Sequence, residues 1–559
     1  MCSFAPAAPC THHALLVGNT AHKAHTCSAC LVIARAKLAQ RTEKVEGGKR
    51  IGSALISVYH KDGLETIVRE LHRLNVHLHS TGGTQEFIEK LGVPVTPVED
   101  LTSYPSILGG RVKTLHPKVF GGILGRRDLA SDVAQLEEFG IPPIDLVIVD
   151  LYPFEATVAA GGTAVEIIEK IDIGGISLIR AGAKNHTDVV IISNQAQYPE
   201  LIRLLTEQDG ATSLAQRKSF AAQAFGISSH YDSAIHNWFT NGEGELRVSA
   251  GPAHHLRYGE NPHQPATFFG DLHGLFEQLH GKELSYNNLL DLDAALELID
   301  DLTTICTGMP SGAEAFAILK HNNACGAAVR ANVKEAWDAA LAGDPVSAFG
   351  GILITTATID KATAEAIDPL FFEIICAPAF DADAFAVLSK KKNRMILKRK
   401  PSATPSRKLR SALNGLLAQS PDTIVDTPAN MRTATKKAPS ANELSDLVFA
   451  NILVKHTKSN AIVLAKNNQL LASGTGQTSR VDALEQAMAK AKKFHFDLRG
   501  AVMASDAFFP FPDCVNIAAE AGITAIVQPG GSVRDQESID ACDQCAIAMC
   551  ITGNRHFKH

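Results

Sequence analysis

Residues 53–84, SALISVYHKDGLETIVRELHRLNVHLHSTGGT, decide the fold of the first half of the chain. The apolar run at 53–58 is typical of a buried strand, and the aliphatic residues over 64–74 recur at the spacing of one helix face. A second short strand at 76–80 follows, and the glycine pair at 82–83 begins another helix. Strands that alternate with helices in this order predict a doubly wound α/β domain built on a parallel sheet.

The same alternation continues beyond this stretch. Apolar, β-rich runs at 145–150 and 188–193 are expected to be further strands of the sheet, with helical segments between them. Long helical patterns then lead to a polar, glycine-rich stretch at 241–255, which is typical of a boundary between domains. We therefore expect one domain over 49–245 and a second region over 246–559.

The second region contains two successive α/β patterns. Strands and helices alternate up to a basic stretch with serine and proline at 390–411, which interrupts the pattern. The alternation then restarts near residue 441. We expect two α/β subdomains, at approximately 250–400 and 410–559, although the sequence has no strict repeat.

The composition excludes several broad classes of protein. The chain of 559 residues has a net charge of −6, which argues against a general nucleic-acid-binding protein but leaves room for a local basic pocket. No apolar run approaches the roughly 18 residues of a membrane-spanning helix. The 11 cysteines are too sparse for a disulfide framework, so the body of the protein is expected to be reduced.

Residues 1–48 differ in composition from the rest of the chain. The first 42 residues contain no Asp or Glu, and they are rich in alanine, serine and threonine. This composition is typical of an organelle transit peptide or a disordered leader, and we expect a plastid destination before a mitochondrial or cytosolic one. An alternative is a small zinc site, because the segment contains a metal-ligand pattern formed by His22, His25, Cys27 and Cys30.

Two polar segments of the first domain are suited to a phosphate group. Residues 81–84, TGGT, place two glycines and two threonine hydroxyls between a strand and a helix, although such a glycine pair is more often a plain turn. Arg111 and Lys113 are two residues apart, so both face one side if the segment is extended, and Thr114 follows them. The alternative for this second segment is a solvated basic loop.

Three further residues have the functional groups that a proton transfer needs. Tyr152 follows the strand at 145–150, and ligands in open α/β sheets bind beyond the carboxyl ends of strands. Asp172 precedes a Gly-Gly step, and Lys184 comes twelve residues later, near the other end of a helical segment. If they meet, these side chains are suited to a ring closure that loses water, whereas Tyr152 is otherwise a core residue. Sequence spacing does not decide between these alternatives.

Residues 320–326, KHNNACG, allow three interpretations: a metal site, a catalytic base, or a plain turn of small residues. Zinc-dependent nucleobase deaminases need His-x-Glu together with Pro-Cys-x-x-Cys. Here two asparagines follow His321, and Cys325 has no second cysteine three residues on. We therefore expect no metal, and His321 is suited to act as a general base beside Lys320.

A dozen motifs in register give a specific resemblance. They are GGRVKTLHP, LYPF, IDIGG with RAGAKNH, LRYGENPHQ, LSYNNLLDLDAA, KHNNACG, DPVSAFGGI, KSNAIV, GTGQTSRVDA, SDAFFPF, PGGSVRDQE and NRHF. With these motifs, residues 50–559 resemble the bifunctional purine biosynthesis family, in which an AICAR formyltransferase is joined to an IMP cyclohydrolase. The resemblance implies a methylglyoxal-synthase-like first domain followed by a pair of cytidine-deaminase-like α/β units.

The resemblance also implies two reactions. One transfers a formyl group from the co-substrate 10-formyltetrahydrofolate to AICAR and gives FAICAR, and the other cyclises FAICAR to IMP with loss of water. It further implies a homodimer with transferase sites across the interface, no catalytic metal, and no nucleic-acid or membrane partner.

For the cyclohydrolase, the positions that match the family would form one nucleotide site. The substrate-binding residues would be Lys61, Thr81, Gly82, Gly83, Thr84, Arg111, Val112, Lys113, Thr114, Asp150 and Ile173. Tyr152 and Lys184 would handle protons, and Asp172 would help to orient the ring.

For the formyltransferase, His321 would remove a proton from the AICAR amine. Lys320 would support the developing charge or protonate the leaving folate nitrogen, and Asn323 would donate hydrogen bonds. The remaining AICAR contacts would be Arg257, Tyr258, Gly350, Glu373, Asn460, Arg480, Phe508 and Arg555. The folate contacts would be Val481, Asp513, Gly530 and Gly531.

Three positions near the nucleotide site depart from the family pattern. Tyr59 and His60 replace a small hydroxyl residue and an acid, and Asp150 replaces an asparagine. An added carboxylate beside a phosphate is expected to weaken binding unless it is protonated or turned away. Two alternatives therefore stay open. In one, only the formyltransferase is active and the cyclohydrolase site is degenerate; in the other, the chain is a non-catalytic nucleotide-binding regulator.

Overall fold

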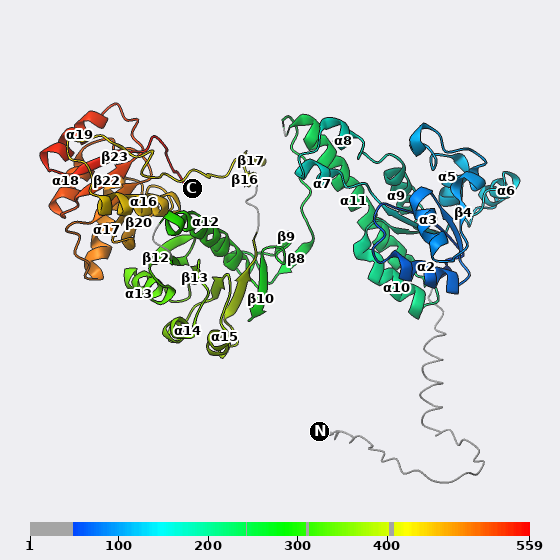
Figure 1. The fold of residues 1–559 in the computed structure, drawn as a ribbon, viewed down its shortest axis with the longest axis horizontal. Coiled ribbons are helices and arrows are strands. Elements are labelled where there is room, and N and C mark those ends of the chain that lie inside the picture. Colours follow the sequence, from blue (N-terminus) through cyan, green and yellow to red (C-terminus); the bar gives the residue numbers. More distant parts are fainter. Residues whose placement is uncertain (1–47, 242, 309–311, 402–406) are drawn as a thin grey trace, which may run out of the picture. The chain divides into compact units, whose positions relative to one another are not determined.

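The computed structural model describes residues 48–559 apart from 242, 309–311 and 402–406. These residues form two compact units, and the chain passes from one to the other between Ser249 and Ala250 (Figure 1). The leader expected from the sequence, with its His22, His25, Cys27 and Cys30 pattern, lies outside the described residues. Among the residues that are described, no helix combines the length and the apolar composition that crossing a membrane requires.

The N-terminal unit is built on a five-stranded sheet with the order β4-β3-β2-β5-β6. In that order the strands are β4 (Thr96–Pro97), β3 (His77–Ser80), β2 (Ser53–Val58), β5 (Leu146–Asp150) and β6 (Val190–Ile192). Two short strands pair separately, and they are β1 (Lys49–Arg50) and β7 (Ala211–Thr212). Each neighbouring pair in the five-stranded sheet is parallel, as the alternating sequence predicts.

Helices connect these strands and pack on the sheet. The helices are α2 (Leu64–Arg73), α3 (Gly82–Lys90), α4 (Val98–Thr102), η1 (Leu108–Gly110), α5 (Pro117–Leu124), α6 (Ala130–Glu138), α7 (Phe154–Ala159), α8 (Ala164–Ile168), α9 (Gly174–Lys184), η2 (Gln195–Gln197), α10 (Tyr198–Glu207) and α11 (Leu214–Thr240). Leu64, Ile67, Val68 and Leu71 of α2 are all buried, which confirms the helical periodicity of the sequence. Because the strand order reverses at β2, right-handed crossovers place α2 and α9 on opposite faces of the sheet.

The reversal of strand order positions the first candidate site. From β2 the chain proceeds to β3 and β4 on one side, and it later returns to β5 and β6 on the other. The loops at the carboxyl ends of β2 and β5 therefore diverge and leave a crevice between them. Ligands bind at this point in open α/β sheets.

The C-terminal unit is a duplicated fold on one continuous sheet of twelve strands. The first repeat comprises α12 (Tyr286–Gly308), β11 (Glu314–Lys320), β12 (Asn323–Arg330), α13 (Val333–Gly343), β13 (Ile352–Thr355), α14 (Lys361–Ile367), β14 (Ile374–Ala377), α15 (Ala382–Leu388) and β15 (Met395–Arg399). The second comprises α16 (Ala441–Lys455), β19 (Ile462–Lys466), β20 (Gln469–Gly474), α17 (Arg480–Lys493), β21 (Val502–Ser505), α18 (Asp513–Glu520), β22 (Ala525–Gln528), α19 (Asp535–Gln544) and β23 (Ala548–Ile551). The strand orders β12-β11-β13-β14-β15 and β20-β19-β21-β22-β23 correspond, and antiparallel pairing of β12 with β20 joins the repeats.

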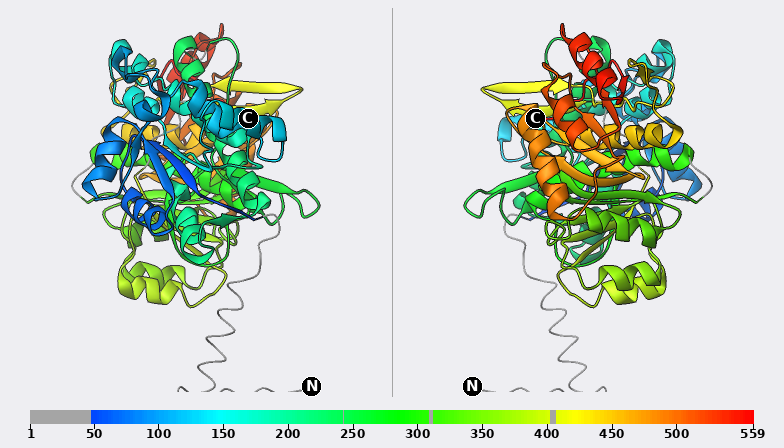
Figure 2. Two further views of the ribbon diagram at one scale, coloured as in Figure 1. Left: turned by 90° about the vertical axis from the view of Figure 1, so that its right-hand side faces the viewer. Right: turned by 90° about the vertical axis from the view of Figure 1, so that its left-hand side faces the viewer.

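Shorter strands complete this unit. The edge strands of the long sheet are β10 (Phe276–His280) and β18 (Arg432–Thr433), and a separate pair is formed by β8 (Ala253–Leu256) and β9 (Ala266–Phe269). The hairpin of β16 (Lys408–Ala412) and β17 (Gly415–Gln419) extends from the unit as its own two-stranded sheet (Figure 2).

One sequence expectation for this unit is wrong. The basic stretch at 390–411 is not simply an interruption, because Met395, Ile396 and Leu397 are buried and form part of β15. The charged residues on both sides of this short apolar run hid the strand. Of the three interpretations left open for residues 320–326, the turn is confined to His321 and Asn322, since the small residues after it form the largely buried strand β12.

Candidate active sites

A cavity of about 760 Å³ lies at the carboxyl ends of β2, β3 and β5, where the strand order predicts a ligand crevice. Most residues assigned from the sequence to the nucleotide site line it, and they are Lys61, Thr81, Gly83, Thr84, Arg111, Lys113, Thr114, Asp150, Tyr152, Asp172 and Ile173. Gly82 and Val112 belong to the same two loops but are not part of the wall.

One end of the cavity is suited to an anion. Thr84 Oγ1 donates to the Val58 carbonyl at 3.0 Å and accepts from the Val58 amide at 3.2 Å, which ties the start of α3 to the end of β2. A Cβ atom added at Gly82 would lie only 3.1 Å from Lys113 Nζ, so this ammonium group lies against the start of the helix. A helix N-terminus and an ammonium group converge there, and among the described residues no carboxylate pairs with Lys113.

The segment that carries Arg111 and Lys113 is not extended, so the condition under which the sequence placed both side chains on one side is not met. It continues as turns after η1, yet both side chains line the cavity. The Arg111 guanidinium pairs with Glu169 at the exposed rim. A phosphate bound at this end would therefore compete with Glu169 for Arg111.

Tyr152, Asp172 and Lys61 bring titratable groups to the cavity. Burial raises the pKa of Asp172, although hydrogen bonds from the Gly175 amide, at 2.6 Å, and the Tyr152 amide oppose this shift. Burial and the charge of Asp172 raise the pKa of Tyr152. Burial lowers the pKa of Lys61, whose ammonium group donates to the Tyr59 carbonyl at 3.0 Å. Such a set of shifted groups is suited to proton transfer.

Lys184 does not join this group, and its expected pairing with Tyr152 is corrected. It is the last residue of α9 and is exposed, whereas Asp172 lies just before the first turn of the same helix. At about 1.5 Å per residue, α9 separates its two ends by roughly 15 Å. The lysines that line the cavity with Tyr152 are instead Lys61, Lys113 and Lys170.

The three departures from the family pattern lie together at the cavity. The His60 amide and His60 Nδ1 lie 2.8 and 2.6 Å from the same Asp150 oxygen, Oδ2. The Tyr59 ring packs edge-on against Tyr152, with centroids 5.6 Å apart, and Lys170 Nζ lies 5.5 Å from the Tyr59 centroid. Asp150 is therefore not a free carboxylate beside the anion end, because His60 binds it.

The second candidate site begins at a tight turn between β11 and β12. His321 and Asn322 form a two-residue loop with φ angles of 52° and 64°, the left-handed conformation typical of such hairpins. Residues other than glycine adopt this conformation rarely and at a cost. His321 is held at the apex of this turn and is exposed.

Lys320 and Cys325 flank this turn in different environments. Lys320 Nζ donates to the Phe349 carbonyl at 2.6 Å, and Gly350 lies beside it. The Cys325 thiol lies buried in β12, 3.4 Å from the Ile318 carbonyl, and burial raises its pKa to about 12. Such a thiol is poorly suited to metal binding. Within the described ranges, no group of three or more potential metal ligands occurs.

Asn323 connects the turn with the second repeat. Its side-chain nitrogen, Nδ2, donates to the His321 carbonyl at 2.7 Å, and its side-chain oxygen, Oδ1, accepts from the Lys458 backbone amide at 2.9 Å. Since β12 and β20 are antiparallel, the start of β12 and the end of β20 lie at the same edge of the sheet. This edge also carries most of the other residues assigned to the formyltransferase.

The edge can be followed from strand to strand. Gly350 and Glu373 precede β13 and β14, Asn460 precedes β19, and Arg480 with Val481 follows β20. Phe508 and Asp513 follow β21, Gly530 and Gly531 follow β22, and Arg555 follows β23. Arg257 and Tyr258 follow β8, and the loop after them reaches α12 through the Glu260 carbonyl, which accepts from Asn287 Nδ2 at 3.2 Å.

Two guanidinium groups at this edge share one aromatic ring. Arg555 and Arg480 lie 4.4 and 5.9 Å from the centroid of Phe557. Arg480 also donates to the fully buried Asp506 at 3.2 Å. Closely spaced guanidinium groups held in this way are suited to a phosphate monoester.

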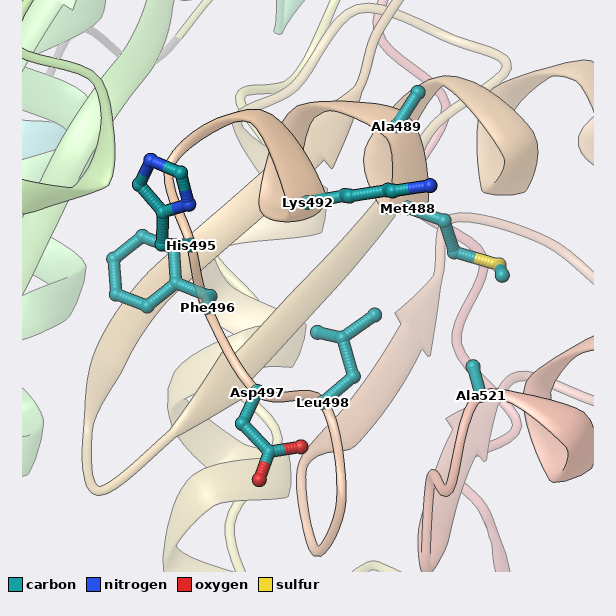
Figure 3. Close-up of a pocket in the computed structure, with 8 residues that line it drawn as sticks. All are labelled: Met488, Ala489, Lys492, His495, Phe496, Asp497, Leu498 and Ala521. Atoms are coloured by element: carbon teal, nitrogen blue, oxygen red, sulfur yellow. The ribbon is translucent and has the colours of Figure 1, made fainter.

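A second cavity, of about 630 Å³, lies at the opposite edge of the second repeat, and Figure 3 shows the residues that line it. Its lining residues are Met488, Ala489, Lys492, His495, Phe496, Asp497, Leu498 and Ala521. They belong to the end of α17 and to loops near the amino ends of β21 and β22. No residue assigned from the sequence lines this cavity, so it is separate from the candidate formyltransferase site.

His556 anchors the C-terminal segment that carries Arg555. The ring is only 3% exposed, and its nitrogens lie 2.7 Å from Asp422 and 3.2 Å from Asp426. Burial opposes the charge, but the hydrogen bonds to both carboxylates outweigh it and raise the pKa of His556 to about 9. Asn554 donates to Asp426 at 2.7 Å and secures the same segment.

This anchor predicts a loss of stability in mild alkali. Because the folded-state pKa of His556 is raised above its ordinary value of 6.5, the protonated ring stabilises the fold fully below about pH 6.5, and this contribution is lost as the pH rises through about 9. The full effect is up to about 3 kcal/mol. Urea unfolding of the wild type and of His556→Gln between pH 6 and 10 measures it. Parallel pH profiles for the two proteins would contradict this role.

Comparisons with known proteins give matches in both units of the chain. The family described as "AICARFT/IMPCHase bienzyme" matches residues 182–490, and the family described as "MGS-like domain" matches residues 63–177. Proteins named "Bifunctional purine biosynthesis protein PurH" from Bacteroides thetaiotaomicron, Chloroflexus aurantiacus and Parvibaculum lavamentivorans are 60%, 46% and 47% identical to this chain. The alignments cover 91%, 92% and 91% of this chain, and 99%, 100% and 98% of the respective relatives.

Proposed function

This chain belongs to the AICARFT/IMPCHase bienzyme family, and we propose which of its residues carry out each of two reactions of purine biosynthesis. It is a bifunctional purine biosynthesis enzyme with AICAR formyltransferase and IMP cyclohydrolase activities. In our proposal, the N-terminal unit closes FAICAR to IMP, and the C-terminal unit transfers a formyl group from 10-formyltetrahydrofolate to AICAR. The matches cover both units and give no support to a degenerate cyclohydrolase or a non-catalytic regulator.

The observation that carries the formyltransferase assignment is His321 at the apex of its turn, beside Lys320. The amine of AICAR is a poor nucleophile, because its lone pair is conjugated with the imidazole ring. As the amine nitrogen attacks the formyl carbon, His321 accepts its proton. The bond between the formyl carbon and folate N10 then breaks, and N10 takes up a proton. We assign this proton to the ammonium group of Lys320, which precedes His321 in the chain. The guanidinium groups of Arg480 and Arg555 suit the phosphate of AICAR.

Tyr152, Asp172 and Lys61 support the cyclohydrolase assignment. Ring closure joins the carboxamide nitrogen of FAICAR to its formyl carbon, and the resulting hydroxyl leaves as water. Tyr152 carries its phenolic proton at neutral pH, as any tyrosine does, and burial raises its pKa further, so its hydroxyl is suited to donate to the developing hydroxyl. Lys61, whose pKa is lowered, is suited to exchange protons in the same cavity, and Asp172 holds the ring. Lys113 and the start of α3 bind the phosphate.

Two observations support a homodimer with shared transferase sites. From Glu373 at β14 to Gly530 at β22 the edge spans seven strand spacings, or roughly 34 Å, which is much longer than one nucleotide. The hairpin of β16 and β17 also exposes Leu413, Leu416 and Leu417, and an isolated hairpin needs a partner surface. We assign that surface to a second copy of the chain. Sedimentation of the wild type against Leu416→Asp tests this assignment.

We also propose that the leader directs the protein to an organelle, with the plastid as the first expectation. The absence of acidic residues from the first 42 residues supports this proposal. A fluorescent protein fused behind residues 1–48 would report the destination, and a uniformly cytosolic signal would contradict organelle import.

The His60–Asp150 pair predicts a compensated effect on the cyclohydrolase. His60→Ala removes the imidazole from the Asp150 carboxylate and leaves it only the backbone amide of residue 60. This change is expected to raise KM for FAICAR about two- to fivefold, since such pairs contribute up to about 1 kcal/mol. His60→Ala combined with Asp150→Asn removes the carboxylate charge and should restore KM. Steady-state formation of IMP measures both variants. A double variant as impaired as the single one would contradict the compensation.

A further inference from the structure

The two repeats of the C-terminal unit contain the same tight turn between their first two strands. His321 and Asn322 in the first repeat have φ angles of 52° and 64°, and Asn467 and Asn468 in the second have 54° and 50°. The register of the strand pair shifts at the same place in both repeats. The shift lies at Ile318/Leu319, just before Lys320, in the first repeat and at Leu464/Ala465, just before Lys466, in the second. The turns are therefore structurally equivalent, but only the first presents a histidine.

The same two groups hold both turns. Lys320 Nζ donates to the Phe349 carbonyl at 2.6 Å, and Lys466 Nζ donates to the Arg499 carbonyl at 2.7 Å. In both repeats, an aspartate from the preceding helix binds turn amides.

The two aspartates occupy the same place in their helices. Asp291 is the sixth residue of α12, and its Oδ1 accepts from the Asn322 amide at 2.6 Å. Asp446 is the sixth residue of α16, and it accepts from the Asn467 and Asn468 amides at 2.9 and 2.6 Å. Each carboxylate thus offsets part of the cost of a left-handed turn, which is about 1–3 kcal/mol per residue.

Asp291 also lies within the electrostatic field of the site. Burial raises the pKa of Asp291, while the hydrogen bond from the Asn322 amide and the charges of His321 and Lys320 oppose this shift. The charges of both side chains therefore affect the pKa of the Asp291 carboxylate, although its hydrogen bond is to the backbone.

We propose that Asp291 is a positioning residue for formyl transfer, which fixes the His321 imidazole by binding the adjacent turn amide. The inference rests on the proposed role of His321 as the base. Without this hydrogen bond from the Asn322 amide to Asp291, which we call the clamp, the turn relaxes and the imidazole moves away from the AICAR amine. The phosphate and folate contacts on the second repeat are unchanged. The expected effect is therefore on kcat and not on KM.

The duplicated turn supplies a matched control for this proposal. Asp291→Ala is expected to lower kcat of formyl transfer by about 10- to 100-fold, with KM for AICAR and folate changed less than about threefold, because a displacement of about 1 Å costs that much in rate. Asp446→Ala breaks the same clamp in the second repeat, and it should lower the melting temperature to a similar extent without this loss of kcat. Asp291→Asn keeps an oxygen acceptor and should recover most of the rate.

The outcomes separate the inference from the function on which it rests. The inference is wrong if Asp291→Ala and Asp446→Ala lower kcat equally, if Asp291→Ala raises KM alone, or if Asp291→Asn is as slow as Asp291→Ala. If instead His321→Ala, measured alongside, transfers formyl groups at the wild-type rate, the proposed function itself fails. IMP formation from supplied FAICAR should be unchanged in all these variants.

Discussion

Formyl transfer by His321→Ala is expected to be slower than in the wild type by about 10²–10⁴-fold, while the conversion of supplied FAICAR to IMP keeps its wild-type rate. The imidazole at the apex of the β11–β12 turn is the group we assign to deprotonate the AICAR amine. Without it, no neighbouring side chain of the turn replaces the base, because Lys320 binds the Phe349 carbonyl and Asn323 is an amide. The cyclohydrolase cavity belongs to the other unit and should not respond.

Two assays and one matched variant make this prediction sharp. The folate-dependent step is followed with AICAR and 10-formyltetrahydrofolate, and ring closure is followed separately with FAICAR. Asn467→Ala changes the equivalent position of the second repeat and should retain formyl transfer. A chelator should also leave the rate unchanged, since the proposal uses no metal. A folded His321→Ala protein at full speed, or a rate abolished by the chelator, would contradict the assignment.

Much of the N-terminal fold follows from local patterns in the sequence. The apolar runs at 53–58 and 145–150 are strands β2 and β5, as predicted, because a buried parallel strand needs a continuous apolar run. The position of Tyr152 just beyond β5 then places its hydroxyl at the carboxyl edge of the sheet. The strand order is not visible in the sequence, because it depends on crossovers between distant segments.

The duplication of the C-terminal unit was only suggested by the sequence, although a local signal was present. Both α12 and α16 are preceded by serine and carry the pattern S-x-N-x-L-x-D-L, which begins at Ser285 and at Ser440. The two aspartates of this pattern, Asp291 and Asp446, are the residues that bind the turns. Sequence reasoning missed Asp291 because its partner is a backbone amide, and such contacts leave no pattern of paired side chains.

The placement of Lys184 illustrates a different limit. Asp172 and Lys184 are neighbours in the sequence motif, but a continuous helix lies between them and directs them to opposite ends. The sequence pattern already placed Lys184 near the far end of a helical segment, and only the family resemblance assigned it to the same site as Asp172. Lys61 is distant from both in the sequence, yet it shares the cavity with Tyr152 and Asp172 because β2 and β5 are adjacent.

Tyr152→Phe is expected to lower the rate of IMP formation from FAICAR by about 100-fold, since the change removes a hydroxyl positioned for proton transfer and leaves the ring in place. Formyl transfer should be unaffected. Tyr104→Phe is the matched control, because Tyr104 is an exposed tyrosine of the same unit outside the cavity wall. The rate of IMP formation from FAICAR, followed by stopped-flow or steady-state detection, is measured for all variants.

Lys184→Ala distinguishes the structural assignment from the one that the sequence motif suggests. Its side chain is exposed at the far end of α9, so we expect Lys184→Ala to close FAICAR at close to the wild-type rate, whereas Lys61→Ala should be strongly impaired. The reverse result, with Lys184→Ala inactive and Lys61→Ala active, would mean that Lys184 reaches a cyclohydrolase site by a route other than its own chain's cavity. Since a homodimer offers such a route, activity recovered by mixing Lys184→Ala with Tyr152→Phe subunits would then identify a site shared between two copies.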